Sequence, residues 1–260
     1  MFTVENLSVR LGTNTILQNV DFTVDAPGQM VGLLGVNGSG KTTLLRAIAG
    51  LLPHTGRCLL DGTALETLTV KRRAQIISYI PQQSGISVSM TAREVVLMGC
   101  NPRLGVLQSP TAAMYAAVEA ALCAVGLADK AERDYLTLSG GERQLCILAR
   151  TIVEDAPLLL LDEPDSALDL ANRSRTAGRL AELVRAGGKT ALLCLHDPTL
   201  ALDWCDTLLL LQNGQITAML HPKTDPVDVL QTALSAVYGP LELLPVTDRT
   251  GRARLALLPL

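Results

Sequence analysis

Residues 35–42 are the part of this sequence in which residue types and spacing most clearly indicate chemistry. They read GVNGSGKT and fit the pattern G-x-x-x-x-G-K-[S/T], in which glycines let backbone N–H groups curl around phosphates. Lys41 would reach the β- and γ-phosphates, and the Thr42 hydroxyl would bind Mg²⁺. A plain glycine turn with a solvated lysine is the alternative, which the complete match disfavours. The expected phosphate-binding residues are Gly35, Asn37, Gly38, Ser39, Gly40, Lys41, Thr42 and Thr43.

Two acidic residues, Asp162 and Glu163, directly follow the apolar run at residues 158–161. Carboxylates at a strand end also occur at ordinary loop starts, so the pair alone does not decide between a structural and a catalytic role. With a phosphate-binding loop upstream, we expect Asp162 to complete the Mg²⁺ shell. We expect Glu163 to act as general base on the attacking water.

A third polar segment, residues 138–144, reads LSGGERQ. Ser139 followed three residues later by Glu142 makes a capping box, which predicts the start of a helix. Gly140 and Gly141 leave the first N–H groups of that helix open to an anion. A capped helix without a ligand is the simpler interpretation, and these residues alone leave both open.

The apolar pattern indicates the elements that must position these residues. Residues 30–34 form an apolar run before the glycine loop, and residues 42–52 carry apolar side chains at helical spacing up to Pro53. A strand, a glycine loop and a helix in that order are typical of a nucleotide-binding βα unit. Further strands suited to a parallel sheet buried on both faces are predicted at residues 158–161, 191–195 and 207–211, with a helix at 170–186.

The remaining segments complete the prediction of an α/β fold with a mostly parallel sheet and flanking helices. Residues 2–10 and 16–24 predict an antiparallel β part at the N-terminus. Residues 84–150 lack strand-like runs and predict an α-helical subdomain inserted into a single domain of residues 1–220. Residues 221–260 predict a C-terminal extension with a short hairpin at residues 241–246 and 252–258.

Composition narrows the function classes. The 260 residues are 48% hydrophobic and 18% charged, which suits a packed globular protein. The net charge of −3 argues against general binding to nucleic acid, whose affinity comes from phosphate neutralisation. The six cysteines show no C-x-x-C pair and no histidine at ligand spacing, so we expect reduced thiols and no zinc framework. Residues 112–128 are apolar but too short for a membrane helix, and we expect a soluble helix there.

Together with the phosphate loop and the acidic strand end, LSGGERQ resembles the signature sequence of ABC-transporter ATPases, and the resemblance covers residues 1–220. It implies that Gln82, rather than Gln83, joins the core to the helical subdomain and senses Mg²⁺ and the γ-phosphate. It implies that His196 contacts the γ-phosphate. By the same resemblance, Asp169 belongs to the D-loop and Leu11 takes the place of the aromatic residue that stacks on adenine.

The resemblance also implies cofactors and partners. ATP and Mg²⁺ would bind between two ATPase subunits of a homodimer, because Ser139, Gly140 and Gly141 of one subunit close over ATP held by the other. ATP would hold the dimer together and hydrolysis would release it, which moves separate transmembrane permease subunits. We expect a peripheral protein at the cytoplasmic face of the inner membrane, served indirectly by a periplasmic or surface substrate-binding protein.

Three positions depart from the family pattern. Leu11 offers adenine an apolar contact without aromatic stacking. Asp165 replaces a residue that is commonly threonine and adds negative charge near the Mg²⁺ site, which predicts slower hydrolysis. Residues 90–105 resemble the segment after the Q-loop in importers of iron–siderophore, haem and cobalamin type, although Cys100 stands where arginine is usual.

We therefore expect the ATPase of a metal-chelate importer, with two alternatives open. A transporter for another solute would keep the same site and use a different permease. A soluble ABC ATPase would have no permease, and the sequence shows no second cassette, long coiled coil or basic face that would favour it. A P-loop kinase would lack the signature sequence.

Overall fold

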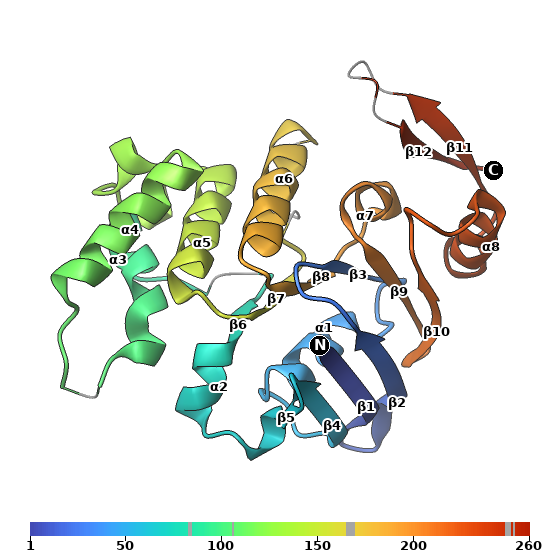
Figure 1. Cartoon of the computed structure of the whole chain (residues 1–260), viewed down its shortest axis with the longest axis horizontal. Coiled ribbons are helices and arrows are strands. Elements are labelled where there is room, and N and C mark those ends of the chain that lie inside the picture. Colours follow the sequence, from blue (N-terminus) through green and yellow to red (C-terminus); the bar gives the residue numbers. More distant parts are fainter. Residues whose placement is uncertain (83–84, 106, 165–169, 248–250, 252) are drawn as a thin grey trace.

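Six strands of the described residues form a mostly parallel sheet at the centre of the molecule. The computed structural model describes residues 1–82, 85–105, 107–164, 170–247, 251 and 253–260 (Figure 1). The strand order is β10-β9-β3-β8-β7-β6, and neighbours are parallel except β10 with β9. The strands are β3 Met30–Leu34, β6 Ile77–Ile80, β7 Leu158–Asp162, β8 Thr190–Cys194, β9 Thr207–Gln212 and β10 Gln215–Leu220.

The two faces of this sheet pack into two hydrophobic cores. Successive residues of a strand point to opposite faces, so Leu158 and Leu160 join one core while Leu159 and Leu161 join the other. Every residue of β3, β7 and β8 is buried, which explains their unbroken apolar sequences. The predicted α/β fold with a mostly parallel sheet is confirmed.

The N-terminal antiparallel sheet has the strand order β2-β1-β4-β5 and contributes to the same core as α1. Asn6 adopts a φ of +49° where the pairing of β1 with β2 shifts register. The buried residues of β1 are therefore even-numbered before this shift, Phe2 and Val4, and odd-numbered after it, Leu7 and Val9. The elements are β1 Phe2–Leu11, β2 Asn14–Val24, α1 Lys41–Ile48, β4 Thr55–Leu60 and β5 Thr63–Ala64.

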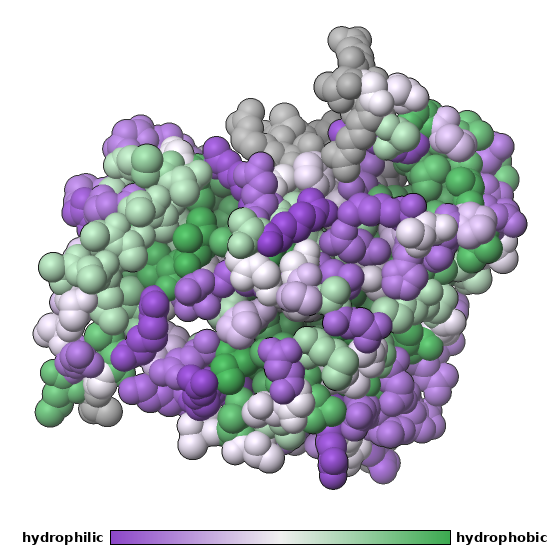
Figure 2. All heavy atoms as spheres, viewed as in Figure 1, coloured by the Kyte–Doolittle hydropathy of each residue, from purple (hydrophilic) through white to green (hydrophobic). Residues whose placement is uncertain are grey.

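Helices dominate the chain between β6 and β7, and Figure 1 shows them at the left of the molecule. Much of this part is coloured as hydrophobic in Figure 2. Helix α4 exposes several alanines, while its Val118 and Leu122 are buried. No helix of the described residues has the length and hydropathy of a membrane span. The elements are α3 Ala92–Leu97, η2 Met98–Arg103, α4 Ala112–Val125, η3 Ala128–Lys130, η4 Tyr135–Thr137 and α5 Gly140–Glu154.

The C-terminal hairpin is present and contacts α7, at the upper right of Figure 1. Its strands pair in antiparallel register, and Arg254 Nη1 of β12 lies 2.5 Å from Asp203 Oδ2 of α7. The remaining elements are η1 Leu65–Thr67, α2 Val70–Ile76, α6 Leu170–Ala186, α7 Pro198–Trp204, α8 Val227–Tyr238, β11 Leu241–Thr247 and β12 Ala253–Pro259.

The structure differs from the sequence prediction mainly in short elements. The predicted helix at residues 42–52 ends at Ile48, because Gly50 adopts a φ of +71° and turns the chain before Pro53. The prediction omitted α2, α7 and α8 and the strands β4, β6 and β10. Strand β4 shows why, since Cys58 and Leu60 are its buried residues and give only one alternation.

Candidate functional site

The phosphate loop connects β3 to α1 and depends on glycine for its conformation. Gly38 and Gly40 have φ angles of +81° and +106°, in the left-handed region that glycine favours. A Cβ atom on Gly35 would lie 2.3 Å from the carbonyl oxygen of Leu211 and 2.7 Å from Ser39 Oγ. Ser39 Oγ is buried and has no hydrogen-bond partner within the described chain. A cradle with an unsatisfied buried hydroxyl fits a bound phosphate.

Lys41 begins α1 and turns its side chain back into the loop. Its Nζ donates to the carbonyl oxygens of Gly35 at 2.7 Å and Val36 at 3.2 Å, and the residue is 6% exposed. Burial lowers the pKa of Lys41, while the carboxylates of Glu163 and Asp162 act in the opposite direction. Because little water competes there, the ammonium can interact strongly with phosphate oxygens.

Thr42 and Asp162 meet across the boundary between α1 and the end of β7. Thr42 Oγ1 donates to Asp162 Oδ1 at 2.9 Å, and Asp162 is 2% exposed. The Tyr79 hydroxyl donates to Asp162 Oδ2 at 3.5 Å and accepts from Arg46 Nε at 3.4 Å. A hydroxyl and a carboxylate supply the oxygen ligands that Mg²⁺ prefers.

Glu163 lies one residue beyond β7 and contacts both other predicted catalytic residues. Its Oε1 lies 2.5 Å from His196 Nε2, and its Oε2 accepts a hydrogen bond from Gln82 Nε2. Glu163 has a φ of +53°, which is unfavourable for a residue with a Cβ atom. The side chain of Glu163 is 14% exposed, while that of His196 is 44% exposed. The structure therefore brings Gln82, Glu163 and His196 together.

A hollow of about 310 Å³ connects the phosphate loop with Glu163 and His196. The predicted residues Asn37, Gly38, Gly40, Lys41, Thr42 and Thr43 line it, and Ile16 of β2 lines it as well. Ile16 was not predicted, because its approach to the loop depends on how the two sheets pack. Leu11 is 44% exposed at the end of β1 and does not line this hollow, so its contact with adenine stays a prediction.

A family comparison explains this arrangement. Residues 17–166, more than half of the 260 residues, match the family model described as ABC transporter. The matched region contains the phosphate loop, residues 138–144 and the acidic pair Asp162 and Glu163 at the end of β7. The chain belongs to the ABC transporter family.

Relatives and solved structures agree with this family. The chain is 40% identical over 251 residues to the hemin import ATP-binding protein HmuV of Pseudomonas aeruginosa, covering 94% of each chain. It is 34% identical over 260 residues to the cobalamin import ATP-binding protein BtuD of Halobacterium salinarum, with 96% of this chain matched, and it spans 65% of that protein's length.

Two solved structures resemble the chain over most of its length. One is described as a metal-chelate type ABC transporter in an inward-facing conformation; it has a TM-score of 0.85 and 26% identity, covering 100% of this chain and 97% of that one. The other is a dimeric ATP-binding cassette in a post-hydrolysis state with ADP and phosphate, with a TM-score of 0.75 and 25% identity, covering 85% and 99%. The fold is thus that of an ABC cassette.

The predicted signature residues Ser139, Gly140 and Gly141 lie at the exposed start of α5. The predicted capping box is present, since Ser139 Oγ accepts from Glu142 N at 3.3 Å and Glu142 Oε2 accepts from Ser139 N at 2.8 Å. Lys130 donates to Glu142 Oε1 at 2.6 Å, and this bond is the main reason that the pKa of Glu142 falls to about 2. The three signature residues do not line the hollow of their own chain.

Three positions named in the sequence prediction lie outside the described residues: Asp169, which was predicted to belong to the D-loop, Asp165 and Gln83.

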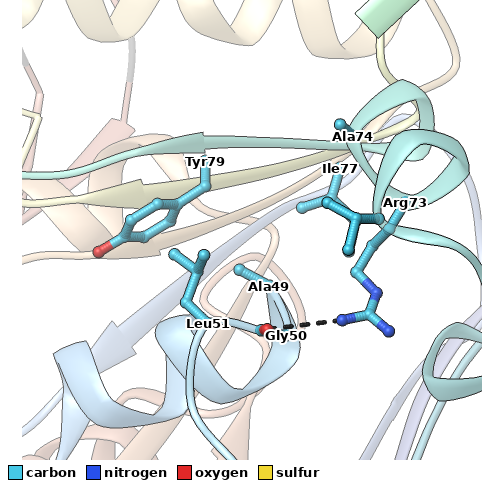
Figure 3. A pocket seen from close by; sticks show the side chains of 8 residues that line it. Ala49, Gly50, Leu51, Arg73, Ala74, Ile77 and Tyr79 are labelled. Carbon is cyan, nitrogen blue, oxygen red and sulfur yellow. Dashed lines mark hydrogen bonds between the residues drawn. The ribbon is translucent and has the colours of Figure 1, made fainter.

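A second hollow of about 240 Å³ lies between the end of α1, α2 and β6 (Figure 3). Figure 3 shows Tyr79 and Leu51 on one side and Arg73 on the other, with Arg73 donating to the carbonyl oxygen of Gly50. Leu51 is 60% exposed and Val70 is 84% exposed, so the hollow has an apolar rim open to solvent. The ring of Tyr79 lines this hollow while its hydroxyl reaches Asp162, so one side chain connects the two sites.

Proposed function

We propose that this chain is the ATP-hydrolysing subunit of an ABC transporter that imports a metal chelate of the haem, cobalamin or iron–siderophore type. The observation that carries the proposal is the position of Glu163, which lines the phosphate-loop hollow and is held by Gln82 and His196. A carboxylate in this place can accept a proton from water that attacks a bound phosphate. The names of the relatives HmuV and BtuD support import of a metal chelate.

In this proposal ATP and Mg²⁺ are the cofactors. Lys41 and the loop N–H groups would bind the phosphates, and Thr42, Asp162 and Gln82 would hold Mg²⁺, which would neutralise charge on the phosphate oxygens. His196, whose Nε2 contacts Glu163 Oε1, would donate a hydrogen bond to the γ-phosphate and orient Glu163. Phosphoryl transfer depends mainly on positioning and charge stabilisation, and these side chains supply both.

We also propose that two copies of the chain form the complete ATPase. Ser139, Gly140 and Gly141 lie at an exposed helix start, where backbone N–H groups of the first turn can bind the phosphates held by another copy. Asp169 would contribute to the same interface. The similarity to a dimeric cassette supports this arrangement.

The hollow of Figure 3 is the surface that we propose for the permease. Its apolar rim, formed by Leu51 and Val70, suits an apolar segment of a membrane protein. The ring of Tyr79 lines the same hollow, and its hydroxyl donates a hydrogen bond to Asp162 in the nucleotide site. Binding there would place the chain at the cytoplasmic face of the inner membrane as a peripheral protein. The substrate-binding protein would act through the permease and not on this chain.

Copurification from membranes tests the transport assignment. The Glu163→Gln protein is extracted from the host's own membranes in mild detergent with ATP and Mg²⁺, since slow hydrolysis should preserve the assembled state. We expect a polytopic permease to copurify with the Glu163→Gln protein when ATP is present. With Lys41→Ala, copurification of the permease should not depend on ATP. Recovery of an active ATPase without any integral membrane protein would contradict the proposal and favour a soluble ABC ATPase.

Transport into proteoliposomes tests the substrate class. The chain and its copurified permease are reconstituted and given haem, cobalamin or a ferric siderophore, together with an amino acid as control. We expect ATP-dependent transport of one chelate and none with Glu163→Gln. Transport of the amino acid alone would show that the ATPase assignment holds and the substrate class is wrong.

A further inference from the structure

Three possible metal ligands lie together outside the nucleotide site. His54 precedes β4, Cys58 lies within β4, and Glu66 lies in η1. One ligand atom from each residue, a ring nitrogen, the thiol sulfur and a carboxylate oxygen, lies within 4.8 Å of the others. This cluster shares no residue with the phosphate-loop hollow.

Both ring nitrogens of His54 face oxygen atoms that accept hydrogen bonds. Its Nδ1 lies 3.3 Å from the carbonyl oxygen of Leu52, and its Nε2 lies 3.1 Å from Glu66 Oε1. Both of these oxygens only accept, whereas a neutral imidazole carries a single N–H, so one ring nitrogen faces its oxygen with a lone pair. In the tautomer with the proton on Nδ1, the lone pair of Nε2 faces the Glu66 carboxylate, and a cation between them, either a proton or a metal ion, would hold the two groups together.

The surroundings match those of a metal-binding histidine. Such histidines usually donate their second N–H to a carbonyl or carboxylate, and Nδ1 of His54 lies 3.3 Å from the carbonyl oxygen of Leu52, where it can donate such a bond. Glu66 Oε1 is held by the backbone N–H of Cys58 at 2.7 Å, so the carboxylate is also oriented. Cys58 is fully buried, so its Sγ faces the His54 nitrogen and the Glu66 carboxylate inside the protein, within 4.8 Å of each.

We propose that His54 Nε2, Cys58 Sγ and the Glu66 carboxylate form a binding site for a thiophilic divalent cation such as Zn²⁺. A metal–sulfur bond forms as the S–H bond breaks, and the thiol proton leaves to solvent. The thiolate and the carboxylate together balance the charge of the ion, and the imidazole stays neutral. The Glu66 side chain is 31% exposed, so water can reach the site and supply a fourth ligand.

Titration with Co²⁺ tests this site in the full chain. The protein is stripped of metal, prepared without a histidine tag and kept in excess Mg²⁺, which occupies oxygen-ligand sites. We expect one equivalent of Co²⁺ to give a thiolate-to-cobalt charge-transfer band and tetrahedral d–d bands, both removed by Zn²⁺. Cys58→Ser should abolish the charge-transfer band, while Cys123→Ser, at an exposed cysteine of α4, should keep it.

Two further variants guard against misfolding as the cause of a loss. His54→Gln and Glu66→Gln leave the thiol in place and should each weaken Co²⁺ binding about tenfold or more, with an unchanged circular dichroism spectrum. Absence of the charge-transfer band from the unmodified chain would overturn the proposal, and would mean that His54 and Glu66 share only a proton. Persistence of the band in Cys58→Ser would also overturn it.

Discussion

His196 Nε2 lies 2.5 Å from Oε1 of Glu163, and both residues line the phosphate-loop hollow. The second carboxylate oxygen of Glu163 accepts from Gln82, so both oxygens have a protein partner. These three residues follow different strands of the sheet, which are β8, β7 and β6. The orientation of Glu163 therefore depends on the packing of three neighbouring strands, and a change in any of them can move the carboxylate.

Glu163→Gln should bind ATP but hydrolyse it slowly. The amide keeps the size of the side chain and its contact with His196, but it cannot accept a proton from water. We expect kcat to fall by about 10²- to 10⁴-fold, the usual contribution of a general base. Steady-state phosphate release measures the rate, and a fluorescent ATP analogue measures binding. Glu119→Gln, at an exposed acid of α4, is the matched control; normal turnover in Glu163→Gln would mean that another group acts as base.

Lys41→Ala should lose nucleotide affinity. The change removes a buried ammonium whose present partners are the carbonyl oxygens of Gly35 and Val36. Charge-assisted hydrogen bonds contribute about 1.5–3 kcal/mol, so we expect the Kd for ATP to rise about 10- to 100-fold. Equilibrium titration with labelled ATP gives this value, and Lys71→Ala on α2 serves as the control. Unchanged ATP affinity would place the nucleotide somewhere other than the phosphate loop.

The sequence was most informative where function depends on consecutive residues. The glycine loop, the acidic pair at the end of β7 and the capping box at Ser139 are each local. The strand and helix around the loop follow from apolar patterns that are equally local. Tyr79 and Ile16 were missed because they reach the site through the order of strands and the packing of two sheets. The proximity of His54 to Glu66 likewise arises from a turn that their spacing does not reveal.

Tyr79→Phe should weaken the binding of Mg²⁺ without damaging the fold. The ring would still line the hollow of Figure 3, while the hydroxyl between Asp162 and Arg46 would be lost. One hydrogen bond contributes about 0.5–1.5 kcal/mol, so we expect the Mg²⁺ concentration for half-maximal ATPase activity to rise about 3- to 10-fold. The kcat at saturating Mg²⁺ should change little.

ATPase activity measured against free Mg²⁺ separates these two parameters. Tyr115→Phe, at an exposed tyrosine of α4, is the control for loss of a phenolic hydroxyl. A lower kcat with the same Mg²⁺ requirement would show that Tyr79 does not act through Asp162.

Glu142 should make the stability of α5 depend on pH. The hydrogen bond from Lys130, followed by that from the backbone N–H of Ser139, lowers the pKa of Glu142 from 4.5 to about 2. A carboxyl group with a lower pKa in the folded state stabilises the protein above the unfolded value. That stabilisation is lost as the pH falls from about 4.5 to about 2. Because the Glu142 side chain is close to solvent, we expect its carboxylate to contribute only about 0.5–1 kcal/mol to the free energy of unfolding at neutral pH.

Glu142→Gln tests this dependence through the free energy of unfolding in urea at a series of pH values. At pH 7 the variant should be less stable than the unmodified chain, and the difference should shrink as the pH approaches about 3, where Glu142 of the unfolded chain is protonated. Glu182→Gln, at an exposed acid of α6, should show no such trend. An equal loss of stability at every pH would instead assign the effect to the shape of the helix cap, because the charge of Glu142 would then contribute nothing.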